Sequence, residues 1–227
     1  MGSEMCIRDR ASLMAGALNA QDLAGLLRSG AEQVRDQHDL LSRLDAAIGD
    51  GDHGTTMKKV ADAMLDAVEQ PHEPALSGLL EANGWNVLSV DGGSSSSLLG
   101  SFFLGMAEPA SGLNALDSPA LAAVFEAGLA KLRAQTPAQL GDKTMLDALI
   151  PAVAALRQAA DEHLPPVEAL ARAAAAAARG AEHTKNCQAK FGRARNLGPR
   201  SLGAADPGAT SISLLFAGFH SGIANLK

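Results

Sequence analysis

Apolar residues recur at helical spacing along most of this chain, and this periodicity limits the possible folds more than any other feature of the sequence. Between Asn19 and Val34 they fall three and four residues apart, which places them on one face of a helix. The same spacing returns at residues 40–44 and 57–68. No window shows the sustained polar and apolar alternation that a half-buried strand requires. The pattern therefore predicts an all-α protein.

Prolines separate further helical stretches, which we expect at residues 76–90, 97–107, 118–134, 145–162, 166–185 and 208–224. Pro151 lies inside one of them, so we expect a kink there or a later start. The chain has no tyrosine, one tryptophan and six phenylalanines, which favours helix over strand. Short connections imply antiparallel neighbours, so we expect a barrel or bundle of about eight antiparallel helices.

The length of 227 residues is compatible with one large domain. Arg8 and Arg10 precede a mildly apolar segment that weakly imitates a signal peptide, but this segment is short and follows Glu4 and Asp9. We therefore expect residues 1–18 to be a non-native or disordered leader and residues 19–227 to form the domain.

Charge and cysteine content exclude several classes of protein. A net charge of −6 without a basic, aromatic-rich patch argues against nucleic acid as a partner. No apolar run reaches the roughly 18 residues needed to cross a bilayer, which argues against a membrane partner. The 2 cysteines are too few for a disulfide framework, so we expect a reducing cytoplasm.

The segment between the second and third apolar stretches is acidic and rich in glycine. Asp45, Asp50 and Asp52 fall close together, with glycines between them and His53 beside the last carboxylate. Two carboxylates about 4 Å apart repel by roughly 4 kcal/mol at an effective dielectric of about 20. A divalent cation removes this cost, and an all-oxygen site favours Mg²⁺ or Ca²⁺ over Zn²⁺. Since Mg²⁺ often keeps positions for phosphate, this loop is a candidate metal and phosphate site.

Three other interpretations of the acidic loop compete with the metal site. Its Gly-x-Gly-x-x-Gly spacing satisfies the dinucleotide fingerprint, but a helical pattern precedes it where a strand is required. An EF-hand fails because the twelfth position from Asp50 is Ala61 and not glutamate. A solvated acidic turn, with an aspartate capping the next helix, remains as open as the metal site when this loop is considered alone.

Other polar segments also have two interpretations. Residues 91–97 resemble a flexible linker, yet they stand between helical stretches, where their amides and hydroxyls would form either a cap or an anion site. Gly141-Asp-Lys-Thr-Met145 is not a P-loop, because the upstream glycine is missing and Asp142 interrupts the motif. The long segment with Arg193 and Arg195 is of the kind that is often functional, although these arginines could also be solvated surface charges.

Five motifs occur in a specific order: Leu-Asp-Ala-Ala-Ile-Gly-Asp-Gly-Asp-His-Gly at 44–54, Gly-Gly-x-Ser at 92–95, Gly-Asp-Lys-Thr-Met-x-Asp-Ala-Leu at 141–149, Gly-Arg-Ala at 192–194 and Asp-Pro-Gly-Ala-Thr-Ser at 206–211. Together they resemble the nucleotide-binding L subunit (DhaL type) of dihydroxyacetone kinases. The resemblance covers residues 19–227. Departures are Ser94–Ser97, where the family commonly has Ala-Ser-Gly-Pro, and Pro199, which replaces an acidic residue.

The resemblance implies a barrel of eight antiparallel helices with ADP or ATP bound by loops at one end. Asp45, Asp50 and Asp52 match positions that hold two Mg²⁺ ions. The expected phosphate contacts are His53, Gly54, Thr55, Thr56, Ser94 and Ser95. Met145 would lie near the base or ribose, and the closing loop would contribute Arg193, Asp206, Pro207 and Gly208.

The family reaction transfers a phosphoryl group from the nucleotide to a small hydroxyketone held by a histidine of a separate K subunit. The resemblance therefore implies a kinase subunit that is active only with this partner, as a homodimer or hetero-oligomer. Asp45, Asp50, Asp52 and Arg193 would be the catalytic residues. A phosphohistidine carrier could rephosphorylate bound ADP, or free ATP could exchange. A non-catalytic nucleotide sensor and a kinase for another three- or four-carbon sugar remain alternatives.

Overall fold

The computed structural model describes residues 16–70 and 75–224. Nine α-helices lie within these residues: α2 (Ala20–Asp36), α3 (His38–Ile48), α4 (His53–Glu69), α5 (Leu76–Leu88), α6 (Gly93–Ala110), α7 (Ser118–Arg133), α8 (Leu146–Asp161), α9 (Pro166–His183) and α10 (Pro207–Ala224). Two short 3-10 helices, η1 (Thr184–Asn186) and η2 (Arg193–Ser201), precede α10. The described residues contain no strand, so the expected all-α class is confirmed and the dinucleotide-binding fold is excluded.

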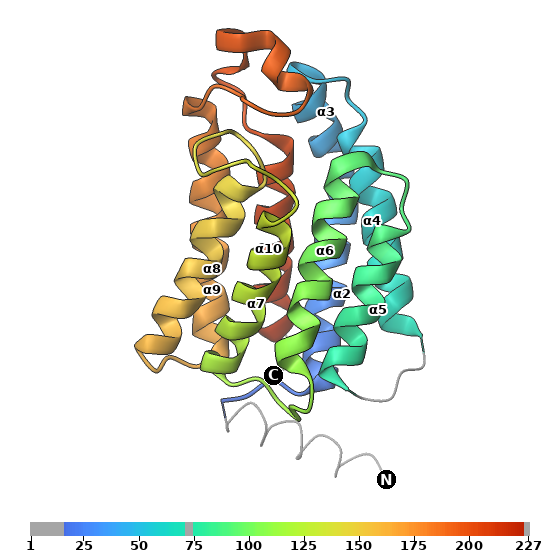
Figure 1. Ribbon diagram of the computed structural model, residues 1–227, viewed down its shortest axis with the longest axis vertical. Helices are drawn as coiled ribbons and strands as arrows, with labels where there is room; N and C mark the ends of the chain where they lie inside the picture. The colour runs from blue at the N-terminus through green and yellow to red at the C-terminus, as the bar shows by residue number, and fades with distance from the viewer. Residues whose placement is uncertain (1–15, 71–74, 225–227) are drawn as a thin grey trace.

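Eight of these helices form a closed ring. Helix α2 packs on α4, each of α4 to α9 packs on the next helix in the chain, and α10 returns to pack against α2. Figure 1 shows these helices running up and down along the long axis, with α3 at the upper end. The expected barrel of about eight antiparallel helices is confirmed.

The interior of the ring is apolar and closely packed. Phe102, Phe125, Phe216 and Phe219 from α6, α7 and α10 are buried and meet at tilted or edge-to-face angles. The ring closes where α10 crosses α2 at glycine, because a Cβ on Gly218 would lie 2.5 Å from the Cα of Gly30. These two glycines therefore let the first and last helices of the ring approach each other.

The direction of the helices brings the sequence motifs to one end of the barrel. The connections around residues 49–52, 89–92, 134–145 and 184–206 all lie at the end that is uppermost in Figure 1. The opposite end holds the turns at residues 111–117 and 162–165. Segments that are far apart in sequence thus share one end because each pair of neighbouring helices runs up and then down.

Helix α6 differs from the sequence expectation. It begins at Gly93 and not at 97, so the Gly-Ser segment is the first turn of a helix and not a flexible linker. Helix α8 (Leu146–Asp161) lies within one residue of the expected stretch at each end and continues through Pro151. Pro151 has no N–H, so the Asp147 carbonyl lacks its usual hydrogen bond within the helix. Helix α9 packs closely against this carbonyl, because a Cβ on Gly180 would lie only 2.1 Å from its oxygen.

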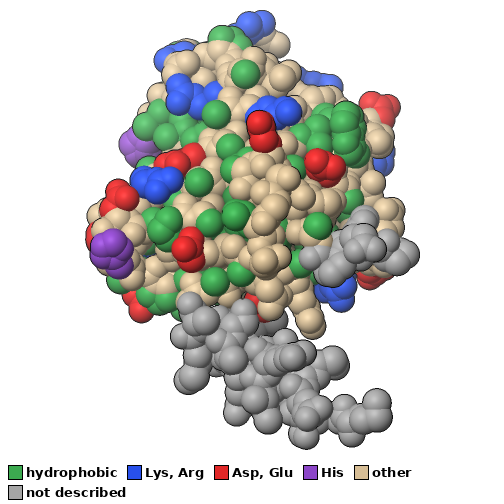
Figure 2. All heavy atoms as spheres, turned by 60° about the horizontal axis from the view of Figure 1, so that its bottom comes forward, with side chains coloured by type: hydrophobic (Ala, Val, Ile, Leu, Met, Phe, Trp, Pro, Cys, Tyr) green, Lys and Arg blue, Asp and Glu red, His purple; other side chains and the backbone are tan. Residues whose placement is uncertain are grey.

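The expected leader lies mostly in residues 1–15, outside the described residues. Leu18 is buried and exchanges backbone hydrogen bonds with Leu116, so the folded domain includes at least one residue before Asn19. Among the described residues, no helix is both long and apolar enough to cross a membrane. On the face seen in Figure 2, Lys and Arg side chains are interspersed with Asp and Glu, and no continuous basic patch covers this face.

Candidate functional site

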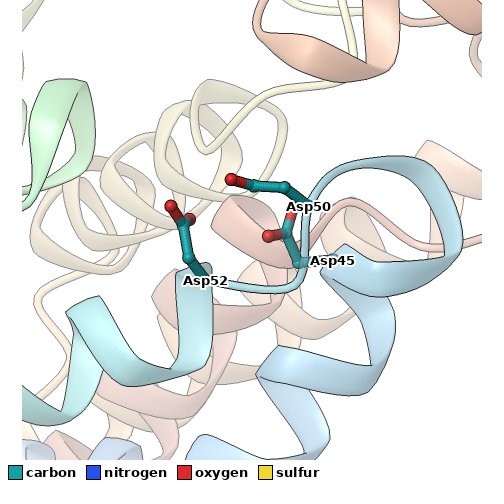
Figure 3. Close-up of side chains that lie close together, drawn as sticks. All are labelled: Asp45, Asp50 and Asp52. Carbon is teal, nitrogen blue, oxygen red and sulfur yellow. The ribbon is translucent and has the colours of Figure 1, made fainter.

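Three carboxylates meet at the upper end of the barrel. Asp45 lies in the last turn of α3, Asp50 lies in the loop that follows, and Asp52 immediately precedes α4. Each offers an oxygen within 4.8 Å of the others. Figure 3 shows the three side chains close together around the loop between α3 and α4. Asp45 is half-buried, whereas Asp50 and Asp52 are exposed. Helix α3 and the N-terminus of α4 therefore bring together the three aspartates that the sequence singled out.

The loop geometry favours the metal interpretation over the helix cap. Asp52 occupies the position that precedes α4, but its side chain makes no capping hydrogen bond. The backbone N–H of His53 donates instead to Asp45 Oδ2 at 3.2 Å. Asp52 is thus left with its carboxylate directed toward Asp45 and Asp50, as Figure 3 shows, and it does not satisfy the helix terminus.

A guanidinium group supplies positive charge to this cluster. Arg193, the first residue of η2, forms an ion pair with Asp50, and its Nη2 lies 3.7 Å from Asp52 Oδ2. Gly192 before it has a φ of 62°, a conformation that favours glycine and turns the chain into η2. The donor set fits a hard divalent ion such as Mg²⁺, because all three side chains offer carboxylate oxygens.

His53 links α4 to α6 and α10 through its imidazole. Its Nε2 lies 2.8 Å from Ser211 Oγ, and its Nδ1 lies 3.5 Å from Ser95 Oγ. Ser211 donates its own hydrogen to the Pro207 carbonyl, so it accepts from His53 Nε2–H. Burial lowers the pKa of His53, although the nearby Asp45 carboxylate acts in the opposite direction. The neutral ring therefore leaves Nδ1 as an acceptor that faces Ser95.

The first turn of α4 carries Gly54, Thr55 and Thr56. Gly54 is buried against α3, where a Cβ would lie 2.0 Å from the His38 carbonyl oxygen, so only glycine allows this approach. Thr55 is exposed, and Thr56 lies against Gly92, whose added Cβ would be 2.5 Å from the threonine methyl group. This contact sets the first turn of α4 beside the start of α6.

The first turn of α6 carries the serines. Ser96 and Ser97 donate to the Gly93 carbonyl, at 3.2 Å and 3.1 Å. Ser94 is exposed, and Ser95 is the serine that faces His53. The hydroxyls therefore divide into a pair that bonds to its own helix and a pair, Ser94 and Ser95, that lies at the exposed N-terminus where an anion is favoured.

Met145 and the Asp206-Pro207-Gly208 segment lie next to one another. Asp206 precedes α10 and accepts from the Ala209 N–H at 2.7 Å. A Cβ on Gly208 would lie 3.1 Å from Asp206 Oδ2 and 3.5 Å from Met145 Cβ. Burial raises the pKa of Asp206 to about 7, against the opposing effects of the Ala209 hydrogen bond and Lys143. Met145 and residues 206–208 therefore form a second cluster. Ser211 connects it to His53, because Ser211 donates to the Pro207 carbonyl and lies 2.8 Å from His53 Nε2.

Sequence reasoning missed several residues that hold the site together. Ser211 is the last residue of the motif at 206–211 but received no role, although it lies 2.8 Å from the His53 ring. Lys143 lies in a rejected P-loop match and in the motif at 141–149 but received no role, yet it is buried and bonds to two carbonyls. Thr184, which accepts from the Asp206 N–H at 2.8 Å, carried no signal in the sequence. These residues act across long sequence separations that motif spacing does not reveal.

An all-helical barrel with a carboxylate trio, an arginine and helix N-termini at one end offers donors for a divalent cation and for an anion. Comparison with known sequences gives the family. The chain belongs to the DAK2 domain family, whose model matches residues 47–221.

Relatives with functional names are similar over most of their length. The PEP-dependent dihydroxyacetone kinase, ADP-binding subunit DhaL, of Escherichia coli (strain K12) is 34% identical over 179 residues, covering 79% of this chain and 85% of the relative. The PEP-dependent dihydroxyacetone kinase 1, ADP-binding subunit DhaL, of Listeria innocua serovar 6a is 37% identical over 185 residues, covering 82% and 87%.

A solved structure has the same fold. The dihydroxyacetone kinase from C. freundii, in complex with AMP-PNP and Mg²⁺, aligns with a TM-score of 0.69 at 28% sequence identity. The alignment covers 87% of this chain and 33% of that kinase, so this chain spans about a third of its length. The barrel found here is thus one part of a larger enzyme in that organism.

Proposed function

We propose that this chain is the nucleotide-binding subunit of a dihydroxyacetone-type kinase. One observation carries the proposal: the acidic loop, the Gly-Ser turn, the arginine and the Asp-Pro-Gly turn all lie at one end of the barrel. Their chemistry suits a nucleoside diphosphate or triphosphate held through metal ions. The names of relatives that are 34% and 37% identical, both ADP-binding subunits, support the same function.

Each side chain then has a distinct task. Asp45, Asp50 and Asp52 would hold two Mg²⁺ ions, which supply charge neutralisation of the phosphates when bound. The amides of the first turn of α4 and the hydroxyls of Ser94 and Ser95 would donate to phosphate oxygens. Arg193, already beside the trio, would stabilise charge on the transferred phosphoryl group. Met145 with Asp206, Pro207 and Gly208 would bound the base and ribose.

The acceptor would come from a partner. A K-type subunit would present dihydroxyacetone or a related hydroxyketone to the upper end of the barrel, and a phosphohistidine carrier would restore ADP to ATP in place. The PEP dependence in the relatives' names favours this carrier over exchange of free ATP. The assembly would be a hetero-oligomer in the cytoplasm, with a homodimer of this chain as the other state.

The test is a reconstituted reaction. The purified chain is mixed with a K-type subunit from one of the relatives and with dihydroxyacetone, in separate reactions with ATP and with PEP plus the phosphohistidine carrier. Ketose phosphate is then measured. We expect product with the carrier and none without the K subunit. Absence of product from dihydroxyacetone and from a four-carbon ketose, under either donor, would contradict the kinase function and favour a nucleotide sensor.

A further inference from the structure

Residues 184–206, the closing loop, connect α9 to α10 and carry Arg193 to the carboxylate trio. A loop of this length requires restraint if it is to keep an arginine in one place. The start and the end of the closing loop converge on a single side chain, that of Lys143 in the connection between α7 and α8.

The ammonium of Lys143 bridges the two ends of the closing loop. Its Nζ donates to the Thr184 carbonyl at 2.7 Å and to the Ala204 carbonyl at 2.5 Å. Lys143 is 2% exposed, and the carboxyl groups of Asp206 and Asp147 lie near it. Burying an ammonium without hydrogen-bond acceptors costs free energy. The buried Lys143 ammonium therefore favours the loop conformation that keeps the Thr184 and Ala204 carbonyls within hydrogen-bond distance.

The backbone at Lys143 is strained in a way that supports this role. Its φ is 62°, a left-handed conformation that residues other than glycine seldom adopt. Such a conformation persists where the surrounding contacts determine it. Asp147 supplies some of them, because its carboxylate accepts from the N–H groups of Gly141 and Thr144 at 2.6 Å and 2.7 Å.

Asp142, the residue before Lys143, holds a third point of the closing loop. Its carboxylate accepts from Lys190 Nζ at 2.6 Å, and its carbonyl accepts from the Lys190 N–H at 3.2 Å. Lys190 precedes Arg193 by three residues. The two neighbouring residues 142 and 143 therefore fix the beginning, the middle and the end of the loop, whereas a phosphate-binding lysine would direct its ammonium toward the open end.

We propose that Lys143 is a positioning residue that clamps the closing loop over the site and thereby sets how long the nucleotide stays bound. The second half of this statement rests on the proposed function, since it requires that Mg-ADP binds. The first half concerns the loop alone. Both are argued from one ammonium that joins Thr184 to Ala204, near the two ends of the loop that carries Arg193.

The test uses the full chain and compares Lys143→Met and Lys143→Gly with wild type, with Lys59→Met on the exposed face of α4 as the matched control. Lys143→Gly removes the ammonium but also relieves the positive φ, so it keeps the experiment informative if the methionine variant unfolds. Tryptic cleavage is mapped without nucleotide at Lys185, Lys190, Arg193, Arg195 and Arg200. Release of a fluorescent ADP analogue is then followed by stopped flow with Mg²⁺.

We expect both variants to be cut about tenfold faster within the closing loop, and to release the analogue about tenfold faster, as loss of a charge-assisted hydrogen bond would cause. Cleavage outside the loop and the control variant should match wild type. Unchanged loop cleavage and release in both variants would overturn the clamp, as would faster cleavage spread evenly over the chain. Wild type that fails to bind Mg-ADP would refute the proposed function, while the loop cleavage would still decide the clamp.

Discussion

The wall of the barrel and its upper end are built from different interactions. The wall consists of helices whose contacts are almost entirely apolar, with the phenylalanine cluster at its centre. Most of the buried polar side chains belong instead to the upper end, including His53, Asp142, Lys143, Asp147 and Asp206. Burial of apolar area therefore stabilises the fold, whereas directed polar contacts place the site.

This division predicts that changes in the wall alter stability without altering the site, and that changes at the upper end do the reverse.

The largest expected effect is in the wall. Phe125→Ala removes a ring that is 1% exposed and contacts Phe102, Phe216 and Phe219. It should lower the free energy of unfolding by about 3–5 kcal/mol. Urea denaturation measures this loss. If the Kd for Mg-ADP also rises severalfold in the folded variant, the wall affects the site and the separation of their roles is contradicted.

The next effect is at the upper end. Asp50→Ala should weaken Mg-dependent ADP binding by at least about 100-fold, since it removes a carboxylate that would bind the metal and also the ion pair of Arg193. The helical content should not change, because Asp50 is exposed in a loop. Titration calorimetry and circular dichroism measure the two quantities, with Asp62→Ala on the exposed face of α4 as control. Unchanged affinity would remove the metal assignment.

Asp206 tests whether a buried polar group also carries a stability cost. Its pKa is raised by burial to about 7, so the folded state keeps a proton that the unfolded state loses near its ordinary pKa of about 4. Wild type should therefore lose stability as the pH rises from 5 to 7, by about 2 kcal/mol relative to Asp206→Asn. The difference should then level off above the folded pKa. Parallel stability curves for the two proteins would show that Asp206 does not titrate in this range.

The smallest effect is expected on the outside of the wall. Arg157 on α8 bonds to both carboxylate oxygens of Glu126 on α7, at 2.8 Å and 2.6 Å, but both side chains are more than a third exposed. Glu126→Gln should cost no more than about 1 kcal/mol of unfolding free energy, and less at high salt. A double-mutant cycle with Arg157→Ala measures the coupling. A coupling well above this value would mean that polar contacts also stabilise the wall.

The sequence predicts the wall better than the upper end. Apolar spacing located each helix to within a few residues, because the ring only requires that one face of each helix be apolar. The start of α6 was missed, since a Gly-Ser segment has low helix propensity and adopts helix here against Thr56 and Val90. The trio was found because its three aspartates lie in one short loop.

The rest of the upper end depends on contacts between distant segments. Lys143 bonds to carbonyls 41 and 61 residues away, and His53 meets Ser211 across 158 residues. No spacing rule within a single sequence predicts such pairs. The resemblance to a known family predicted roles for Arg193 and residues 206–208. The contacts of Lys143 and Thr184 that hold this part of the chain are seen only in the structure.

Native mass spectrometry of the purified chain, incubated with excess Mg²⁺ and ADP and then buffer-exchanged, tests the central claim most directly. We predict a mass increased by one ADP and two Mg²⁺ ions, with both lost together in Asp50→Ala. A wild-type spectrum that shows the chain alone, or ADP retained equally without Mg²⁺, would contradict a nucleotide held at the upper end of the barrel through metal ions.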